Sequence, residues 1–211
     1  MIVAPDHLVI GCATLAQGID HLARVTGASA IAGGKHALMG THNAVMKLGP
    51  RLYLELLAVD PDAPPPGRPR FFDLDKPAMR DALAIAPALI GWAAHTDDLD
   101  DALLRATIAP GVATKMTRGD LAWRLTIPDD GVRPAGGVLP ALIEWPPGVH
   151  PAERMADSGV TLVELAASHP APATIRAALA AWKLGDAMHV SYAATPRLAA
   201  MLRTPRGMVA L

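Results

Sequence analysis

The same order of predicted elements occurs twice in this chain: a strand, a helix and then three strands. In the first copy, alternating or continuous apolar runs predict strands at 7–12, 31–38, 41–48 and 52–59, with a helix after Thr14. In the second copy the strands are at 88–96, 112–117, 120–127 and 139–145, with a helix after Asp97 or Asp98. Two such units predict a mixed α+β fold, not a helical bundle or a parallel sheet with helices on both faces.

Residues that begin and end helices mark the first predicted helix. Thr14 suits a helix N-cap, and Gln17 stands at the third position of a capping box. Leu15 and Ile19 begin an apolar stripe at helical spacing, and Gly27 suits the left-handed conformation that ends many helices. We therefore expect an amphipathic helix with one face on the sheet.

Proline separates the two copies. Residues 60–70 (DPDAPPPGRPR) contain five prolines, which neither donate to a sheet ladder nor continue a helix. After the second copy, a strand at 160–167, a helix at 174–184 and short strands from residue 188 predict a partial third unit. We expect a first βαβββ unit at 1–60, a Pro-rich connector at 61–87, a second βαβββ unit at 88–150 and an additional C-terminal α/β unit at 151–211, together one compact domain.

Composition argues against several classes of protein. The 19 Lys and Arg and 20 Asp and Glu give a net charge of −1, which leaves no basic surplus for nucleic-acid phosphates. The lone Cys12 excludes an intramolecular disulfide and a multi-cysteine zinc site. No run approaches the roughly 18 apolar residues of a membrane helix, and the N-terminus lacks a signal-peptide pattern. We expect a cytoplasmic protein whose partner is a small-molecule ligand, not nucleic acid or a membrane.

Strand alternation places the polar residues of the first unit on one face of the sheet. On each strand one alternating set is mainly apolar and is expected to face the helix. The opposite set holds His7, Asn43, Lys47, Tyr53 and Glu55. We expect this set to form a concave surface, with Asn43, Tyr53 and Lys47 as candidate substrate-binding residues.

Two glutamates within apolar strands are the most informative residues. Glu55 lies in LYLELLAV, and Glu144 lies in LPALIEW in the second unit. A buried carboxylate without a partner is costly, so each requires water, a cation, a hydrogen-bond donor or a substrate. Solvation on an open sheet face is the plain alternative for Glu55. Both are candidate catalytic residues.

Three segments, in this order, resemble the glyoxalase-like domain family of the vicinal oxygen chelate superfamily. They are the opening DHLVIGC, the H-x3-GT-x-N segment that starts at His36, and YLELLAVDP. The resemblance extends over about residues 5–200. It implies paired βαβββ units that curl into an open, cup-shaped sheet around the active site.

The same resemblance implies a ligand set for a metal ion. Metal-dependent members take ligands from the first and last strands of both units, which here offers His7, Glu55 and Glu144. The fourth position is Gly91, and His95 on the same strand face is roughly 13 Å further along. One imidazole and two carboxylates suit Zn²⁺, Ni²⁺, Mn²⁺ or Fe²⁺, with a glutamate free to move a proton.

Three functions remain open at this stage. The first is a metal-dependent lyase, isomerase or dioxygenase that acts on a small oxygenated metabolite. The second is a metal-free protein that binds or sequesters a small molecule, favoured by Gly91 and by three tryptophans able to line a pocket, Trp92, Trp123 and Trp145. The third is a scaffold or a dimerisation module, with a homodimer as the expected assembly. His150 follows Glu144 closely enough for a bent loop to bring it to the cup.

Overall fold

The computed structural model describes residues 3–119 and 121–211, whose strands form two sheets. The large sheet contains β1 (Val3–Gly11), β2 (Ile31–His36), β3 (Thr41–Gly49), β4 (Leu52–Val59), β5 (Ala88–Thr96), β6 (Val112–Arg118), β7 (Leu121–Ile127) and β8 (Ala141–Glu144). The small sheet contains β9 (Thr161–His169), β10 (His189–Tyr192), β11 (Arg197–Thr204) and β12 (Gly207–Ala210). The helices are α1 (Leu15–Thr26), α2 (Pro77–Ile85), α3 (Leu99–Leu104) and α4 (Pro172–Ala181), with 3₁₀ turns at Pro134–Gly137 and Pro151–Arg154. The predicted α+β fold is confirmed.

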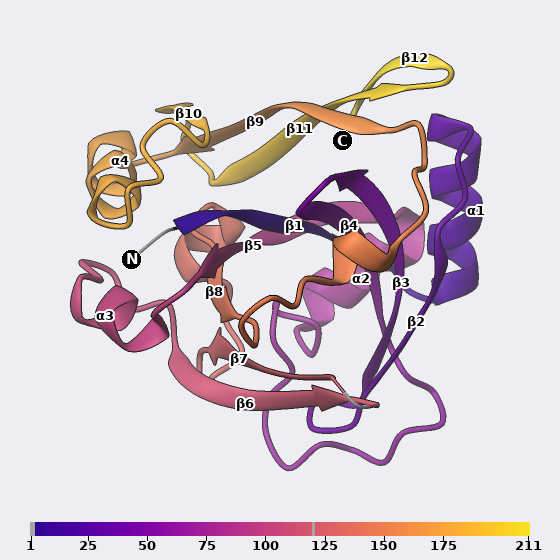
Figure 1. Ribbon diagram of the computed structural model, residues 1–211, viewed down its shortest axis with the longest axis horizontal. Coiled ribbons are helices and arrows are strands. Elements are labelled where there is room, and N and C mark those ends of the chain that lie inside the picture. Colours follow the sequence, from indigo (N-terminus) through magenta and orange to yellow (C-terminus); the bar gives the residue numbers. More distant parts are fainter. Residues whose placement is uncertain (1–2, 120) are drawn as a thin grey trace.

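The two predicted units meet side by side in the large sheet, whose order is β2-β3-β4-β1-β5-β8-β7-β6. Within each unit the first strand pairs in parallel with the last, β1 with β4 and β5 with β8. The antiparallel pair β1 and β5 joins the units. The sheet curls so far that its end strands β2 and β6 contact each other (Figure 1), which produces the predicted cup.

Helix α1 forms where its end signals predict. The Gln17 backbone N–H donates to Thr14 Oγ1 (3.1 Å), and Gly27 ends the helix at φ 76°. A left-handed φ suits glycine because other residues meet steric strain there. The helix buries Gly18 and Leu22 against the outer face of the sheet.

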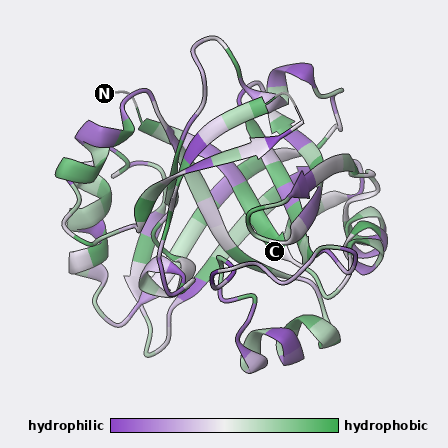
Figure 2. Ribbon diagram, turned by 90° about the horizontal axis from the view of Figure 1, so that it is seen from below, coloured by the Kyte–Doolittle hydropathy of each residue, from purple (hydrophilic) through white to green (hydrophobic). Residues whose placement is uncertain are grey.

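The large sheet separates two apolar cores. The outer core lies under α1, α3, α4 and the small sheet and includes Leu8, Leu54 and Trp92. The inner core fills the cup and includes Val9 and Leu57. Figure 2 shows hydrophobic segments along the strands that cross the middle of the molecule. Alternate residues of one strand therefore contribute to different cores, as the alternation predicts.

The connector differs from its prediction. Its second half forms α2, which begins at Pro77, a position where a helix tolerates proline because the N–H is not needed. Before this helix, Phe71 and Phe72 enter the inner core and close part of the cup. Strand β8 is shorter than predicted, and residue 120, where one predicted strand begins, lies outside the described residues. Within the described ranges, no helix is both long and apolar enough to span a membrane.

Candidate functional site

A small cavity of about 30 Å³ lies inside the cup. Its polar lining comes mainly from the first unit: His7 on β1, His36 on β2, and Tyr53 and Glu55 on β4. Arg118 on β6 adds a cation, and the remaining wall is apolar: Phe71, Phe72, Met116, Trp123, Leu125, Ile143 and Trp145. The structure thus brings together three of the predicted residues, His7, Tyr53 and Glu55.

His7 stands between two carboxylates. Its Nδ1 donates to Asp6 Oδ1 (2.6 Å), and its Nε2 lies 3.6 Å from Glu55 Oε2. All three side chains are buried. The first contact is a short, charge-assisted hydrogen bond, whereas the second is longer than a hydrogen bond and leaves both atoms facing the cavity. Asp6 therefore fixes the ring while Nε2 faces Glu55.

The charges of this group shift the pKa values of its members. Burial acts to lower the pKa of His7, but the hydrogen bond and charge of Asp6, together with the charge of Glu55, outweigh burial and raise it above its usual value. Burial acts to raise the pKa of Asp6, but hydrogen bonds from His150 and His7 hold it well below its usual range. Asp6 is therefore ionised and His7 favours its protonated form.

Asp6 accepts two further hydrogen bonds on its other oxygen. Trp145 Nε1–H donates to Oδ2 (2.8 Å), and His150 Nε2 lies 3.1 Å from the same atom. Because His150 Nδ1 accepts from the Ala152 N–H (3.2 Å), its Nε2 carries the proton and donates. The loop after β8 thus brings His150 to Asp6, the carboxylate that orients His7.

Asn43 orients the other carboxylate. Its Nδ2 donates to Glu55 Oε1 (2.5 Å), and its Oδ1 accepts from the Gly34 N–H (2.8 Å) and from Arg118 Nη1 (3.4 Å). A Cβ at Gly33 would lie 2.0 Å from Asn43 Oδ1, so this close approach of β2 requires glycine. With Oε1 engaged, Glu55 presents Oε2 to His7.

The other two predicted binding residues have different surroundings. The Tyr53 ring stacks on the His7 imidazole, with centroids 4.6 Å apart, and burial raises the Tyr53 pKa well above its usual value. Lys47 does not line the cavity; its Nζ donates to the Met155 carbonyl (3.3 Å) beneath the loop after β8. Their roles in binding substrate stay predictions.

The structure does not bring Glu144 together with His7 and Glu55. Its Oε1 accepts from the Leu99 N–H (3.0 Å) at the start of α3, and its Oε2 accepts from Arg124 Nη1 (3.0 Å). On β8 the residues that face the cup include Ile143, followed by Trp145, so Glu144 points to the outer side. Glu144 was predicted to be the counterpart of Glu55 because both are glutamates within apolar strands. The alternation of this short strand instead places Glu144 on the opposite face of the sheet.

The predicted three-ligand metal site does not fit this arrangement. Among residues 3–119 and 121–211, no three His, Cys, Asp or Glu side chains are placed to hold one metal ion. The Gly91 position, where the family pattern expects a ligand, faces an aromatic ring: a Cβ there would lie 2.8 Å from Phe72 Cε1. The predicted ligands His7, Glu55 and Glu144 therefore do not form one metal site.

Sequence reasoning missed three members of the site. Asp6 was overlooked because alternation places it opposite His7; the β1–β5 register shifts between Pro5 and His7, and this irregularity lets neighbouring side chains meet. Arg118 comes from the far edge of the sheet, which curling brings to β2. In the sequence, His36 stood out only as the first residue of the H-x3-GT-x-N segment and was not predicted to line the site. Burial lowers the pKa of His36, and its Nδ1 hydrogen-bonds Thr41 Oγ1 (3.1 Å).

The protein is thus a cup built from two βαβββ units, and a cluster of buried polar side chains lies on the part of the cup formed by the first unit. Residues 6–183 match the family model described as a glyoxalase-like domain. The chain belongs to this family, as the resemblance predicted. No functionally curated protein matches the sequence.

Of three similar solved structures, the first has a TM-score above 0.5 and supports the fold. A hypothetical protein from Staphylococcus aureus has a TM-score of 0.55 at 17% identity, covering 86% of this chain and 75% of that one. Methylmalonyl-CoA epimerase from Mycobacterium tuberculosis has a TM-score of 0.38 at 21% identity, covering 68% and 88%. A mutant of 4-hydroxymandelate synthase from Streptomyces coelicolor has a TM-score of 0.44 at 16% identity, covering 98% and 61%.

Proposed function

We propose that this protein is a proton-transfer enzyme, an isomerase or a lyase, that acts on a small oxygenated metabolite. The observation that carries the proposal is the pair formed by His7 Nε2 and Glu55 Oε2, which face each other at 3.6 Å beside an enclosed cavity. A hydrogen bond to the other polar atom of each side chain fixes its orientation: Asp6 binds His7 Nδ1, and Asn43 binds Glu55 Oε1. Two oriented groups of opposite charge suit acid–base catalysis.

The chemistry follows from the charges of the pair. Glu55 Oε2 takes a proton from the carbon next to a substrate carbonyl, and the electron pair of that C–H bond moves into the new carbon–carbon double bond. The carbonyl oxygen gains negative charge and accepts a hydrogen bond or a proton from His7 Nε2. Return of the proton to the opposite face of the same carbon completes an epimerisation. Where that carbon carries a hydroxyl group, return of a proton to the former carbonyl carbon, with loss of the hydroxyl proton, moves the carbonyl and completes an isomerisation. Loss of a leaving group from the carbon beyond it re-forms the carbonyl and completes an elimination.

The surroundings strengthen these interactions. The cavity wall is largely aromatic or aliphatic, so few water molecules compete for the two polar groups. Arg118 lines the cavity and stacks above Trp123, with its Cζ 5.9 Å from the ring centroid. Its charge favours a substrate oxygen that becomes negative. Asp6 acts through His7 and is a positioning residue.

A dioxygenase receives less support. Activation of oxygen requires a redox metal held by several protein ligands, typically two His and one carboxylate. His7 and Glu55 supply two candidate ligands, and Glu144 binds α3 and Arg124 instead. Proton transfer needs only the two groups that face each other.

Deuterium exchange tests the proposal without knowledge of the natural substrate. Small 2-oxo acids, ketones and hydroxyaldehydes incubated with the protein in D₂O should exchange the hydrogen next to the carbonyl, as followed by proton NMR. Glu55→Gln removes the base and should lower the exchange rate by about 10² to 10⁴. Glu144→Gln should leave it within about threefold, and a chelator should leave it unchanged.

Two outcomes would contradict the proposal. Binding of these compounds without exchange in the wild-type protein would favour the metal-free binding protein. Exchange that a chelator abolishes and a divalent ion restores would favour a metal enzyme.

A further inference from the structure

Arg118 places a positive charge in the wall of the inner cavity. Among residues 3–119 and 121–211, no carboxylate pairs with this guanidinium: its Nη1 makes one long hydrogen bond, 3.4 Å, to Asn43 Oδ1, and its Cζ lies 5.9 Å from the Trp123 ring centroid. A guanidinium has five N–H donors in a planar fork that matches the two oxygens of a carboxylate. Most of the Arg118 donors are therefore available to a ligand.

Arg118 lies at the mouth of the cavity, closer to solvent than the catalytic pair. Its side chain is partly exposed, whereas His7 and Glu55 are 5% and 6% exposed, and all three line the same cavity. One amide group links Arg118 to Glu55, because Asn43 accepts from Arg118 through Oδ1 and donates to Glu55 Oε1 through Nδ2. A small molecule can therefore contact the guanidinium and Glu55 Oε2 at the same time.

A glycine on β2 makes room for the Arg118 side chain. A Cβ at Gly34 would lie 2.6 Å from Arg118 Cδ and 2.7 Å from its Cγ, so the side chain lies directly against the β2 backbone. This contact occurs where the curled sheet brings β2 and β6 together. The Gly34 N–H also donates to Asn43 Oδ1 (2.8 Å), the atom that accepts from Arg118. Gly34, Asn43 and Trp123 together fix the direction of the guanidinium.

The charges around the cavity make Arg118 necessary for an anionic ligand. Asp6 and the ionised base Glu55 carry two negative charges, against one positive charge on the protonated His7. A carboxylate that entered beside this group would be repelled and would lose its hydration. Within the described lining, Arg118 is the one side chain with a permanent positive charge, and its charge and hydrogen bonds offset both costs.

We propose that Arg118 determines the specificity of this site by binding the carboxylate of a short 2-oxo acid. This inference rests on the proposed function and names its substrate class. The carboxylate pairs with the guanidinium at the mouth of the cavity. The neighbouring carbonyl oxygen faces His7 Nε2, and the carbon on its other side presents a hydrogen to Glu55 Oε2. The cavity volume, about 30 Å³, restricts the substrate to a short chain.

Pyruvate and pyruvamide provide a matched pair of probes. They share a methyl ketone and differ in whether the adjoining group is a carboxylate or a neutral amide. Pyruvate should bind at least about tenfold more tightly, because charge-assisted hydrogen bonds are stronger than neutral ones. NMR titration measures both affinities, and pyruvate should shift the Arg118 Nε–H signal, assigned with Arg118→Lys.

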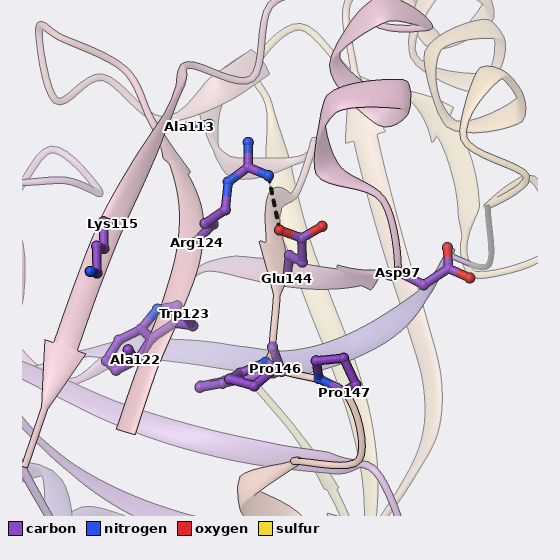
Figure 3. A pocket seen from close by; sticks show the side chains of 10 residues that line it. Asp97, Ala113, Lys115, Ala122, Trp123, Arg124, Glu144, Pro146 and Pro147 are labelled. Carbon is purple, nitrogen blue, oxygen red and sulfur yellow. Dashed lines mark hydrogen bonds and ion pairs between the residues drawn. The ribbon is translucent and has the colours of Figure 1, made fainter. Parts of the chain in front are cut away.

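Removal of the charge tests the role of Arg118. Arg118→Gln should lower the affinity for pyruvate to about that for pyruvamide and should affect pyruvamide much less. The matched control is Lys115→Gln, which removes one positive charge from the same strand. Lys115 is exposed and lies on the outer face of the sheet, near the Arg124–Glu144 pair (Figure 3), so the preference for pyruvate should persist.

Gly34→Ala tests the geometry while the charge is retained. The added methyl group displaces the Arg118 side chain from β2 and keeps the backbone N–H that binds Asn43. The preference for pyruvate should fall at least about threefold, because hydrogen bonds weaken steeply when their geometry is disturbed. If Arg118→Gln fails to fold, this variant and the wild-type titration still decide the question.

The proposal fails if the wild-type protein binds both probes equally, if the preference survives in folded Arg118→Gln or is unchanged in Gly34→Ala, or if Lys115→Gln removes it equally. Failure of the proposed function is distinct: the wild-type protein would bind pyruvate through Arg118 yet show no deuterium exchange of its methyl hydrogens. Equal exchange of pyruvate and pyruvamide would instead support the proposed function and overturn the role of Arg118.

Discussion

The two βαβββ units share a topology but present different chemistry to the cup. The first unit buries His7, Asn43 and Glu55 on its inner face, with Asp6 beneath them. The inner face of the second unit is apolar at Ala93, Ile143 and the adjacent Trp145, as well as at Trp123. The first unit thus supplies His7 and Glu55, while the second supplies most of the apolar wall together with the cation Arg118. Repeated topology does not imply repeated chemistry.

Glu55 and Glu144 show how small the difference between the units is. Glu55 lies opposite Val9 in the β1–β4 ladder and faces the cup. Glu144 shares its strand face with Leu142, which belongs to the outer core. A shift of one residue along a strand moves a side chain to the other face of the sheet. One carboxylate therefore faces the cavity, while the other binds the start of α3.

Removal of the buried charge of the first unit should have the largest effect on stability. Asp6 accepts three hydrogen bonds with no exposed surface, and Asn offers one oxygen where two are needed. Asp6→Asn should lower the free energy of unfolding by about 3–5 kcal/mol, as expected when a buried ion pair loses one partner. Urea denaturation measures this change.

The matched substitution in the second unit is Glu144→Gln. Its side chain is partly exposed, and its pair with Arg124 is near the surface, so a loss of at most about 1 kcal/mol is expected. Equal losses for the two variants would show that the units do not differ in the way described.

A smaller loss of stability is expected from a side chain added at Gly91 in the second unit. A Cβ at Gly91 would meet Phe72 Cε1 at 2.8 Å and Cδ1 at 2.9 Å, so the ring must move. Gly91→Ala should destabilise the protein by about 1–3 kcal/mol. The control is Gly67→Ala in the connector, where a Cβ meets nothing within 4 Å.

A second substitution tests the cause. Phe72→Leu removes the ring edge, so the double variant should be more stable than the sum of the single effects implies. Strict additivity of the two effects in thermal unfolding would contradict the role of Gly91 in admitting Phe72.

Much of the fold was predictable because local patterns determined it. Thr14 and Gly27 placed α1, and strand alternation placed His7, Tyr53 and Glu55 on the cup face. The family pattern then supplied the curled sheet, which alternation alone does not give.

The rest depended on features that a regular pattern does not contain. The register shift at Asp6 lets that residue reach His7, although alternation assigns it to the other face. Arg118 joins Asn43 only because the two ends of the sheet meet. Trp92 was expected near a pocket but packs in the outer core, with its indole N–H on the Val138 carbonyl (2.8 Å). Long-range curvature and local irregularity therefore limited the prediction of the site.

The central claim is that Asp6 holds His7 in its protonated form opposite Glu55. Because the folded-state pKa of His7 is raised, its contribution to stability is complete below the unfolded value of about 6.5 and is lost as pH rises through the folded-state pKa. An NMR titration of the imidazole signals, assigned with His7→Gln, measures that pKa directly. The account predicts a value above the usual one in the wild-type protein and a lower value in Asp6→Asn; a wild-type value at or below about 6.5, or no change in Asp6→Asn, would contradict it.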